Sequence, residues 1–264
     1  PWPPFILKSY LADVNYATSA MRLETDRTNR DGSAPFGGIK QIQLVSGADA
    51  WNIGANGVAA PAPAAVAERQ LNLLLTPAGF IRAAKANNAT VRTQGSEKIV
   101  TFTTSDRRRV QGTLNSQNVL VKTDTILDNP VFGDMPVETT YSDFSVYAGV
   151  MFPGTIVQNQ GGHPFLELKV AEVRPNGAIA IEAPAVVRGA KIAPVTVTSQ
   201  KLGDGLWYLT GGSHHSVLVE FRDHLVVIEG PQNEDRSTAV VAEVKKLVPA
   251  KPIRYVVNPH VHFD

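Results

Sequence analysis

The sequence predicts an α+β fold in two parts: a curved antiparallel β domain over residues 1–197 with one broken helix, and a β-β-β-α-β segment over residues 198–264. Two observations lead to this prediction. Up to residue 197, short alternating or β-branched runs are separated by turn pairs such as Gly37-Gly38, which is typical of antiparallel strands. From Lys201 the order becomes three apolar strands, one helix with a buried stripe and a further strand, which indicates a different arrangement of layers.

The first part is expected to hold nine strands, each a short run of β-branched or alternating residues. They span residues 20–25, 39–45, 98–104, 110–113, 118–125, 137–142, 155–160, 165–173 and 194–197. Helix formers occupy residues 64–75 and 77–86, and the pair Thr76-Pro77 divides them, because proline cannot donate the helical hydrogen bond. We therefore expect one broken helix packed on a curved sheet.

The second part is expected to hold four strands and one helix. The strands span residues 206–210, 216–221, 225–228 and 253–257, and the helix spans residues 237–248. Asn233, Asp235 and Ser237 are the candidate N-caps of this helix. Its buried stripe is expected to comprise Val240, Val241, Val244, Leu247 and Val248. Since a helix between two strands normally makes a right-handed parallel crossover, the run 253–257 is predicted to be a central strand beside 225–228.

Composition narrows the classes of function. The formal net charge is +1, so there is no electrostatic case for a nucleic-acid or membrane-surface partner. No apolar run approaches the roughly 20 residues that span a bilayer. The chain has no cysteine, which excludes disulfides, thiolate catalysis and Cys-ligated zinc, and leaves His and carboxylates as the strong metal ligands.

Two histidines and an aspartate follow the last predicted strand at alternate positions: His260, His262 and Asp264. Alternate side chains in a tight loop can converge on one point, so the three are candidate ligands for Zn²⁺ (one or two ions), or for Fe²⁺ or Mn²⁺. Open α/β sheets place their sites at the carboxyl ends of strands, where this loop follows. The alternative is that both histidines are surface residues near the chain end.

Four stretches carry a resemblance to a known family. They are Leu202-Gly203-Asp204-Gly205-Leu206-Trp207, Gly211-Gly212-Ser213-His214-His215-Ser216, Val226-Val227-Ile228-Glu229-Gly230 and Val256-Val257-Asn258-Pro259-His260-Val261-His262-Phe263-Asp264. In this order they resemble the start of the metallo-β-lactamase superfamily, whose loop pattern is H-x-H-x-D-H. The resemblance implies the first part of an αββα domain. In it His260 and His262 would ligate the first metal ion, and Asp264 would ligate the second and hold the attacking hydroxide as a catalytic residue.

The resemblance implies a metal-dependent hydrolase in which a metal-bound hydroxide attacks an ester, lactam, thioester or phosphoester. Two features depart from the family pattern. Pro259 replaces the usual small polar residue before the first histidine and fixes φ there. The last histidine of the motif and the later ligands of the family would follow Asp264. The chain is therefore expected to be truncated within the domain and inactive alone, because a catalytic zinc needs about three protein ligands and an open position.

His214 and His215 stand in the predicted turn between two strands of the second part, near the mouth of such a site. Adjacent residues of a strand point to opposite faces, so at most one of them lines the site. The alternative is that both are ordinary turn residues. His163 and His224 are expected to be exposed turn residues.

Residues 141–173 loosely resemble the sheet of the periplasmic lipoprotein-carrier fold, an unclosed β-barrel with a helical plug. The residues that carry this resemblance are Asp143-Phe144, Gly149-Val150, Phe152-Pro153 and Glu167. It implies a periplasmic or secreted protein, with a cytoplasmic one as the alternative. It also leaves a second function open, a carrier that binds a hydrophobic ligand in the β domain, against a purely structural β domain. An uncovered sheet face in the second part would favour a homo-oligomer.

Overall fold

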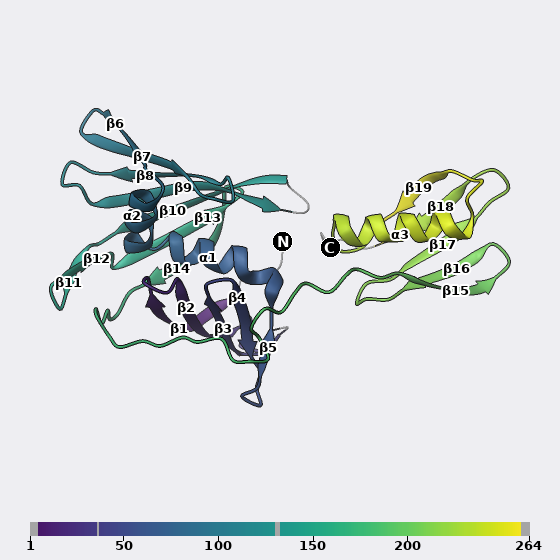
Figure 1. The fold of residues 1–264 in the computed structure, drawn as a ribbon, viewed down its shortest axis with the longest axis horizontal. Helices are drawn as coiled ribbons and strands as arrows, with labels where there is room; N and C mark the ends of the chain where they lie inside the picture. The colour runs from purple at the N-terminus through teal and green to yellow at the C-terminus, as the bar shows by residue number, and fades with distance from the viewer. Residues whose placement is uncertain (1–4, 36, 130–132, 260–264) are drawn as a thin grey trace. The chain divides into compact units, whose positions relative to one another are not determined.

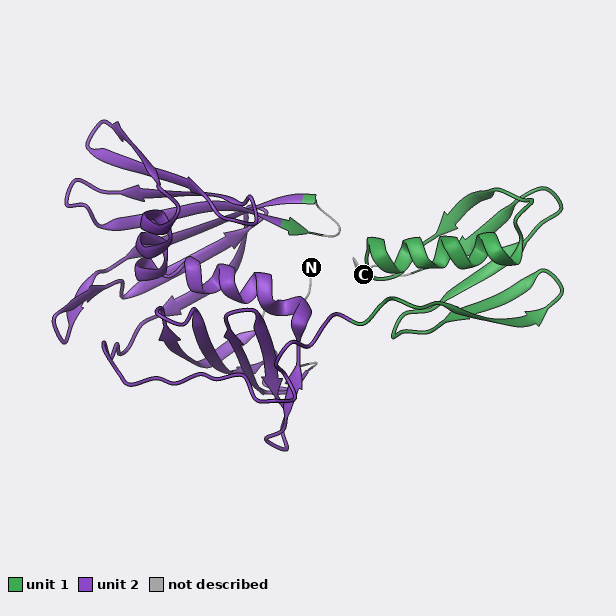
Figure 2. Ribbon diagram, in the orientation of Figure 1, with its two compact units in different colours: residues 1, 128–133, 193–264 green, residues 2–127, 134–192 purple. Residues whose placement is uncertain are grey.

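The computed structural model describes residues 5–35, 37–129 and 133–259. Over these residues the chain is β-rich, with three α-helices and several antiparallel sheets, which confirms the predicted α+β class. It divides into two compact units (Figure 2). The large unit comprises residues 2–127 and 134–192, and the small unit comprises residues 193–264 together with residues 1 and 128–133. Of the helices described, none has the length and hydropathy needed to cross a membrane.

The large unit contains two main sheets, in which neighbouring strands follow one another in the chain except at one pair of the larger sheet (Figure 1). The five-stranded sheet has the order β1 (Ile6–Asn15), β2 (Ala20–Thr28), β3 (Lys40–Ser46), β4 (Asp49–Ile53) and β5 (Ala59–Pro61). The seven-stranded sheet has the order β14 (His163–Lys169), β13 (Thr155–Gln160), β10 (Gly133–Ser142), β9 (Leu120–Asn129), β8 (Arg109–Leu114), β7 (Glu97–Thr103) and β6 (Thr90–Gln94). A hairpin of β11 (Ser145–Tyr147) and β12 (Val150–Phe152) is inserted between β10 and β13.

Most predicted strands are present, and the differences have physical reasons. The strand predicted at residues 194–197 is absent, because β-branched residues form a strand only beside a partner, and residues 191–197 have no regular structure. In the large unit, the strands that the prediction lacks are β1, β4, β5, β6, β11 and β12. Most side chains of β1 are exposed and all those of β6 are, so neither shows the alternation of apolar and polar residues that marks a half-buried strand.

The predicted break in the helix is confirmed at Thr76. A 3₁₀ turn, η1 (Pro63–Ala65), and α1 (Val66–Leu74) precede it, and α2 (Pro77–Ala86) follows it. The Thr76 hydroxyl accepts a hydrogen bond from the Gly79 amide at 3.2 Å and shares another with the Tyr16 hydroxyl at 2.8 Å. Pro77 occupies the first helical position, where no amide hydrogen is needed, so the cap and the proline together start α2.

Replacing Thr76 by Ala is expected to lower the free energy of unfolding by about 1–2 kcal/mol, because the Gly79 amide loses its cap and the Tyr16 hydroxyl loses a partner. Urea unfolding followed by circular dichroism measures this change. Thr76→Ser keeps the hydroxyl and is the control. Equal losses for the Ala and Ser variants would show that the methyl group, and not the cap, matters.

Both helices pack on the sheets of the large unit. Leu73 of α1 lies in a cluster with residues of the five-stranded sheet, and Leu71 lies in one with β10 of the seven-stranded sheet. α2 packs on the seven-stranded sheet through Phe80, which is fully buried. A β-carbon on Gly112 of β8 would lie 2.2 Å from Phe80 Cζ, so glycine is required to admit the ring. α1 therefore packs on both sheets, and α2 packs on the seven-stranded sheet.

A covering segment, residues 179–187, closes the other face of the five-stranded sheet. Val187 of this segment and Trp51 of β4 are buried together, with exposed fractions of 1% and 2%. The Asn15 side-chain amide donates a hydrogen bond to the Ile179 carbonyl at 2.9 Å and so holds the start of the segment. The sheet is therefore covered on both faces, by α1 on one and by irregular chain on the other.

The small unit is built on one five-stranded sheet. Its order is β15 (Thr198–Gly203), β16 (Leu206–Thr210), β17 (Ser216–Glu220), β18 (Leu225–Ile228) and β19 (Ile253–Val257). α3 (Glu234–Leu247) connects β18 to β19, and these two strands pair in parallel, so the predicted parallel crossover is confirmed. β15 is an additional edge strand whose residues are all exposed, which explains why the sequence shows no burial pattern there.

Two expectations for this unit are wrong. Over the residues that the structure describes, β19 is an edge strand and not a central one, and Tyr255 and Val256 are 55% and 59% exposed. Val241 is 36% exposed, whereas Val240 and Val244 are buried against the sheet. Position 241 lies about 100° further around the helix than position 240, which takes it past the edge of the contact.

Candidate functional site

Four segments of the small unit meet at one end of its sheet. β18 and β19 are parallel, so their carboxyl ends lie side by side, and the Glu229 amide donates to the Val257 carbonyl at 2.7 Å. The Ser216 hydroxyl, at the start of β17, donates to the Glu229 carbonyl at 2.9 Å. α3 begins one turn before its predicted start, and Asn233 caps it by accepting from the Arg236 amide at 3.0 Å. We call this end of the sheet the loop end; it comprises residues 211–216, 229–236 and 257–259.

The backbone of the loop end adopts uncommon conformations. Glu229 and Gln232 have φ values of 75° and 65°, in the left-handed region that residues other than glycine rarely adopt. Gly211 has a φ of 108°, and a β-carbon there would lie 2.6 Å from the Thr196 carbonyl oxygen, so glycine is required. Pro231 is fully buried. Such strained residues persist where the surrounding structure holds them, and they concentrate at functional sites.

Arg236 of α3 joins three chain segments at the loop end. The residue is 2% exposed, its Nη1 donates to the Thr196 carbonyl at 2.5 Å, and its Nη2 donates to the His214 carbonyl at 3.0 Å. Arg236 is not among the site residues that the sequence predicts. The helical spacing nevertheless holds a signal, because positions 236, 240 and 244 place Arg236 on the same buried stripe as Val240 and Val244.

The two adjacent histidines of the β16–β17 loop have different surroundings. His214 is half-buried, its Nδ1 lies 2.8 Å from Ser213 Oγ, and its carbonyl accepts the hydrogen bond from α3. His215 is exposed, its Nδ1 lies 2.9 Å from Thr210 Oγ1, and its ring centroid is 5.2 Å from that of Tyr208. His215 therefore contacts β16, whereas His214 is tied to the start of α3.

The predicted metal ligands His260, His262 and Asp264 lie outside the described residues. β19 ends at Val257, at the loop end, and the chain continues toward them through Asn258 and Pro259. Among the described residues, no group of three or more His, Asp or Glu side chains could hold a metal ion. The donor set in the sequence, two imidazoles and a carboxylate, nevertheless matches the ligands that zinc and similar divalent ions take in proteins.

His163 is exposed as predicted, but His224 is not: its side chain is 17% exposed. The His224 ring stacks on Phe221, with centroids 5.0 Å apart and planes 5° apart, which covers it. Its Nδ1 lies 2.9 Å from Asp223 Oδ1, and this hydrogen bond, with the nearby Arg254 cation, holds the pKa of Asp223 below its usual value. The cluster precedes β18, at the opposite end of that strand from the loop end, so it takes no part in the candidate site.

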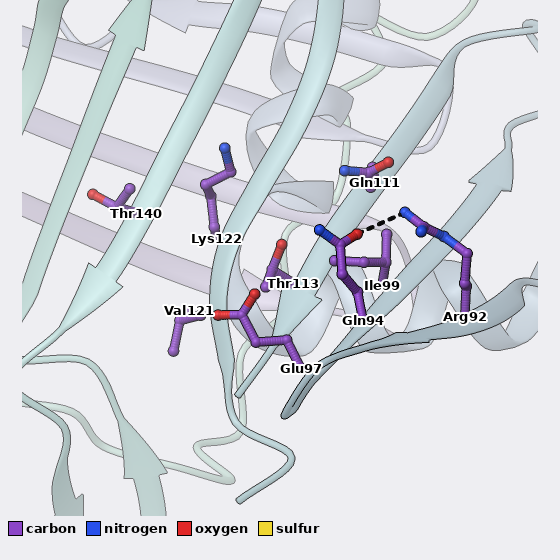
Figure 3. Close-up of a pocket in the computed structure, with 9 residues that line it drawn as sticks. All are labelled: Arg92, Gln94, Glu97, Ile99, Gln111, Thr113, Val121, Lys122 and Thr140. Atoms are coloured by element: carbon purple, nitrogen blue, oxygen red, sulfur yellow. Dashed lines mark hydrogen bonds between the residues drawn. The ribbon is translucent and has the colours of Figure 1, made fainter. Parts of the chain in front are cut away.

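A polar depression of 440 Å³ lies on the seven-stranded sheet of the large unit (Figure 3). It is lined by Arg92, Gln94, Glu97, Ile99, Gln111, Thr113, Val121, Lys122 and Thr140. Its cations already have partners: Lys122 lies 3.0 Å from Asp124 and 2.9 Å from Glu138. Arg92 donates to the Gln94 side chain at 2.9 Å. Because both cations already have hydrogen-bond partners within the depression or beside it, we regard the loop end as the stronger candidate.

No family model matches the chain, and no curated protein matches it. One solved structure that it resembles is a LolA superfamily protein from Nitrosomonas europaea. The two chains are 14% identical, the TM-score is 0.31, and the likeness covers 58% of this chain and 73% of that chain. This likeness is weak, and none of the comparisons supports the resemblance to the metallo-β-lactamase superfamily, which therefore stays a proposal.

Proposed function

We propose that the protein is a metal-dependent hydrolase of the metallo-β-lactamase kind, with its site at the loop end of the small unit. One observation carries the proposal. β19 pairs in parallel with β18, and its carboxyl end lies beside the turn that follows β18. In the sequence, Asn258 and Pro259 follow this end and are followed by His260-Val261-His262-Phe263-Asp264. Folds with parallel strands place their ligands at such carboxyl ends.

Each predicted ligand has a role in this proposal. His260 and His262 bind one divalent ion as neutral imidazoles, with Zn²⁺ preferred over Fe²⁺ or Mn²⁺, and Asp264 contributes a carboxylate to this ion or to a second one. Such an ion, when bound, supplies the Lewis acidity that hydrolysis requires. The role of the protein is to hold the metal ligands and the neighbouring loops in place. The substrate would be a small molecule with an ester, lactam, thioester or phosphoester bond.

Elemental analysis tests the proposal directly. The protein, produced from its full reading frame, is expected to contain about one or two equivalents of a divalent transition metal. Dialysis against a chelator should remove the metal and, with it, the hydrolysis of chromogenic ester, lactam, thioester and phosphoester substrates. Addition of Zn²⁺ should restore both. A folded protein that takes up no Zn²⁺ would refute the proposal.

The alternative function is a carrier for a hydrophobic ligand in the large unit, and a ligand between α2 and the seven-stranded sheet would have to displace Phe80. Phe80 is fully buried between them, and its ring occupies the space that the missing side chain of Gly112 leaves. A fluorescent fatty-acyl probe distinguishes the two functions. Saturable binding of this probe by a protein that takes up no metal would favour the carrier.

A further inference from the structure

Arg236 occupies a place where a cation is costly. It lies in the first turn of α3, at the positive end of the helix dipole, and only 2% of the residue is exposed. In the described part of the chain no carboxylate pairs with its guanidinium, and its Nε has no hydrogen-bond partner. A buried charge without an ion-pair partner is an exception to the usual rules of local stability, and such exceptions concentrate at functional sites.

The contacts of Arg236 compensate only part of this cost, and all of them go to backbone carbonyls. Nη1 holds Thr196, just before β15, and Nη2 holds His214 in the β16–β17 loop. Gly212 of the same loop lies against the guanidinium, since a β-carbon there would be 3.5 Å from Arg236 Cζ. One side chain therefore fastens the β16–β17 loop to the start of α3.

We infer that Arg236 is a positioning residue for the proposed metal site: it fixes the β16–β17 loop and so sets His214, rather than His215, in the wall of the loop end. This inference rests on the proposed function. The different surroundings of the two histidines support it, because the His214 carbonyl is a partner of Arg236, whereas His215 contacts Thr210 and Tyr208 of β16. Groups that hold the residues around a metal usually affect its affinity and spectrum.

The two hydrogen bonds of the residue 236 side chain favour arginine over lysine. The two carbonyls that Arg236 holds belong to separate segments, and a planar guanidinium presents several fixed donors at once. A lysine ammonium at the same position is a point charge on a flexible stem and can replace part of these bonds. Arg236→Lys should therefore be intermediate between the wild type and Arg236→Met, which keeps the apolar stem and removes every donor.

The test uses the full-length protein with Co²⁺ as the spectroscopic probe. Hydrogen exchange of the amides in residues 211–215 measures whether the loop is held, and the visible absorption of bound Co²⁺ measures the metal site. Arg236→Met is expected to speed exchange in 211–215 on the order of tenfold. It should also weaken Co²⁺ binding by about 10- to 100-fold and change its spectrum. The exposed Arg222, in the turn before β18, gives the matched control Arg222→Met, which should change neither.

Each other outcome has a defined meaning. Unchanged exchange in a folded Arg236→Met protein would overturn the inference. So would faster exchange with an unchanged Co²⁺ affinity and spectrum, because Arg236 would then be merely structural. If Arg236→Met fails to fold, the same measurements on Arg236→Lys decide. A wild-type protein that binds no Co²⁺ would refute the proposed function itself, and the inference with it.

Discussion

Replacing His260 by Ala is expected to abolish metal-dependent hydrolysis, with a loss on the order of a thousandfold or more, and to remove the bound metal. The physical reason is that zinc holds its catalytic geometry with about three protein ligands, and the loss of one imidazole leaves too few. Elemental analysis and steady-state rates on the four substrate classes measure the two effects. In their metal-free forms the variant and the wild type should unfold at the same urea concentration, because neither protein then has metal–ligand bonds to lose.

The control for this experiment is His163→Ala. His163 is an exposed residue at the start of β14, in the large unit, and its loss should leave the metal content and the rates unchanged. Full metal content in the His260→Ala protein would mean that His260 is not a ligand. Loss of metal with unchanged hydrolysis would mean that the activity belongs to another site.

Replacing Phe80 by Ala is expected to lower the free energy of unfolding of the large unit by about 3–5 kcal/mol. The Phe80 ring is fully buried, lies 5.4 Å from the Phe102 ring, and fills the space above Gly112. Its removal leaves a cavity among rigid strands that cannot collapse to fill it. Because a domain of this size is stable by only about 5–15 kcal/mol, urea unfolding should show a large fall in the midpoint.

Two further variants make this prediction specific. Phe165 of β14 is 60% exposed, so Phe165→Ala should cost less than about 0.5 kcal/mol. Adding Gly112→Val to the Phe80→Ala protein places new atoms in the cavity and should restore part of the loss, about 1 kcal/mol. A cost below about 1 kcal/mol for Phe80→Ala would show that α2 is not firmly packed on the sheet.

Elements whose burial follows a simple period could be predicted from the sequence with their boundaries. β13 and β18 span the predicted residues 155–160 and 225–228, and α2 begins and ends where the helix formers do. In each case turn residues or a proline bound the run, so the local signal and the fold agree on its limits. β1 and β6 lack such a signal, because their side chains are mostly exposed.

The candidate site could be predicted only in part, because its geometry depends on tertiary contacts. The parallel crossover that brings the ends of β18 and β19 together follows from the order of strands and helix. The distinction between His214 and His215 does not, since it depends on Arg236, which reaches the loop from 22 positions further along the chain. The edge position of β19 cannot be predicted for a similar reason, because an apolar, β-branched run is compatible with both a central and an edge strand.

The covering segment 179–187 has a consequence for where the large unit ends. Its last strand, β14, stops at Lys169, yet Val187 completes the burial of Trp51, on a sheet from the opposite end of the sequence. Removal of the chain after Lys169 would therefore take the apolar covering segment away from the five-stranded sheet and expose the Trp51 side chain to water. The stretch between β14 and β15 is thus more than a linker, because part of it packs in the core of the large unit. Residues 179–187 in its middle belong to the hydrophobic core, whereas residues 170–178 before them are mostly exposed.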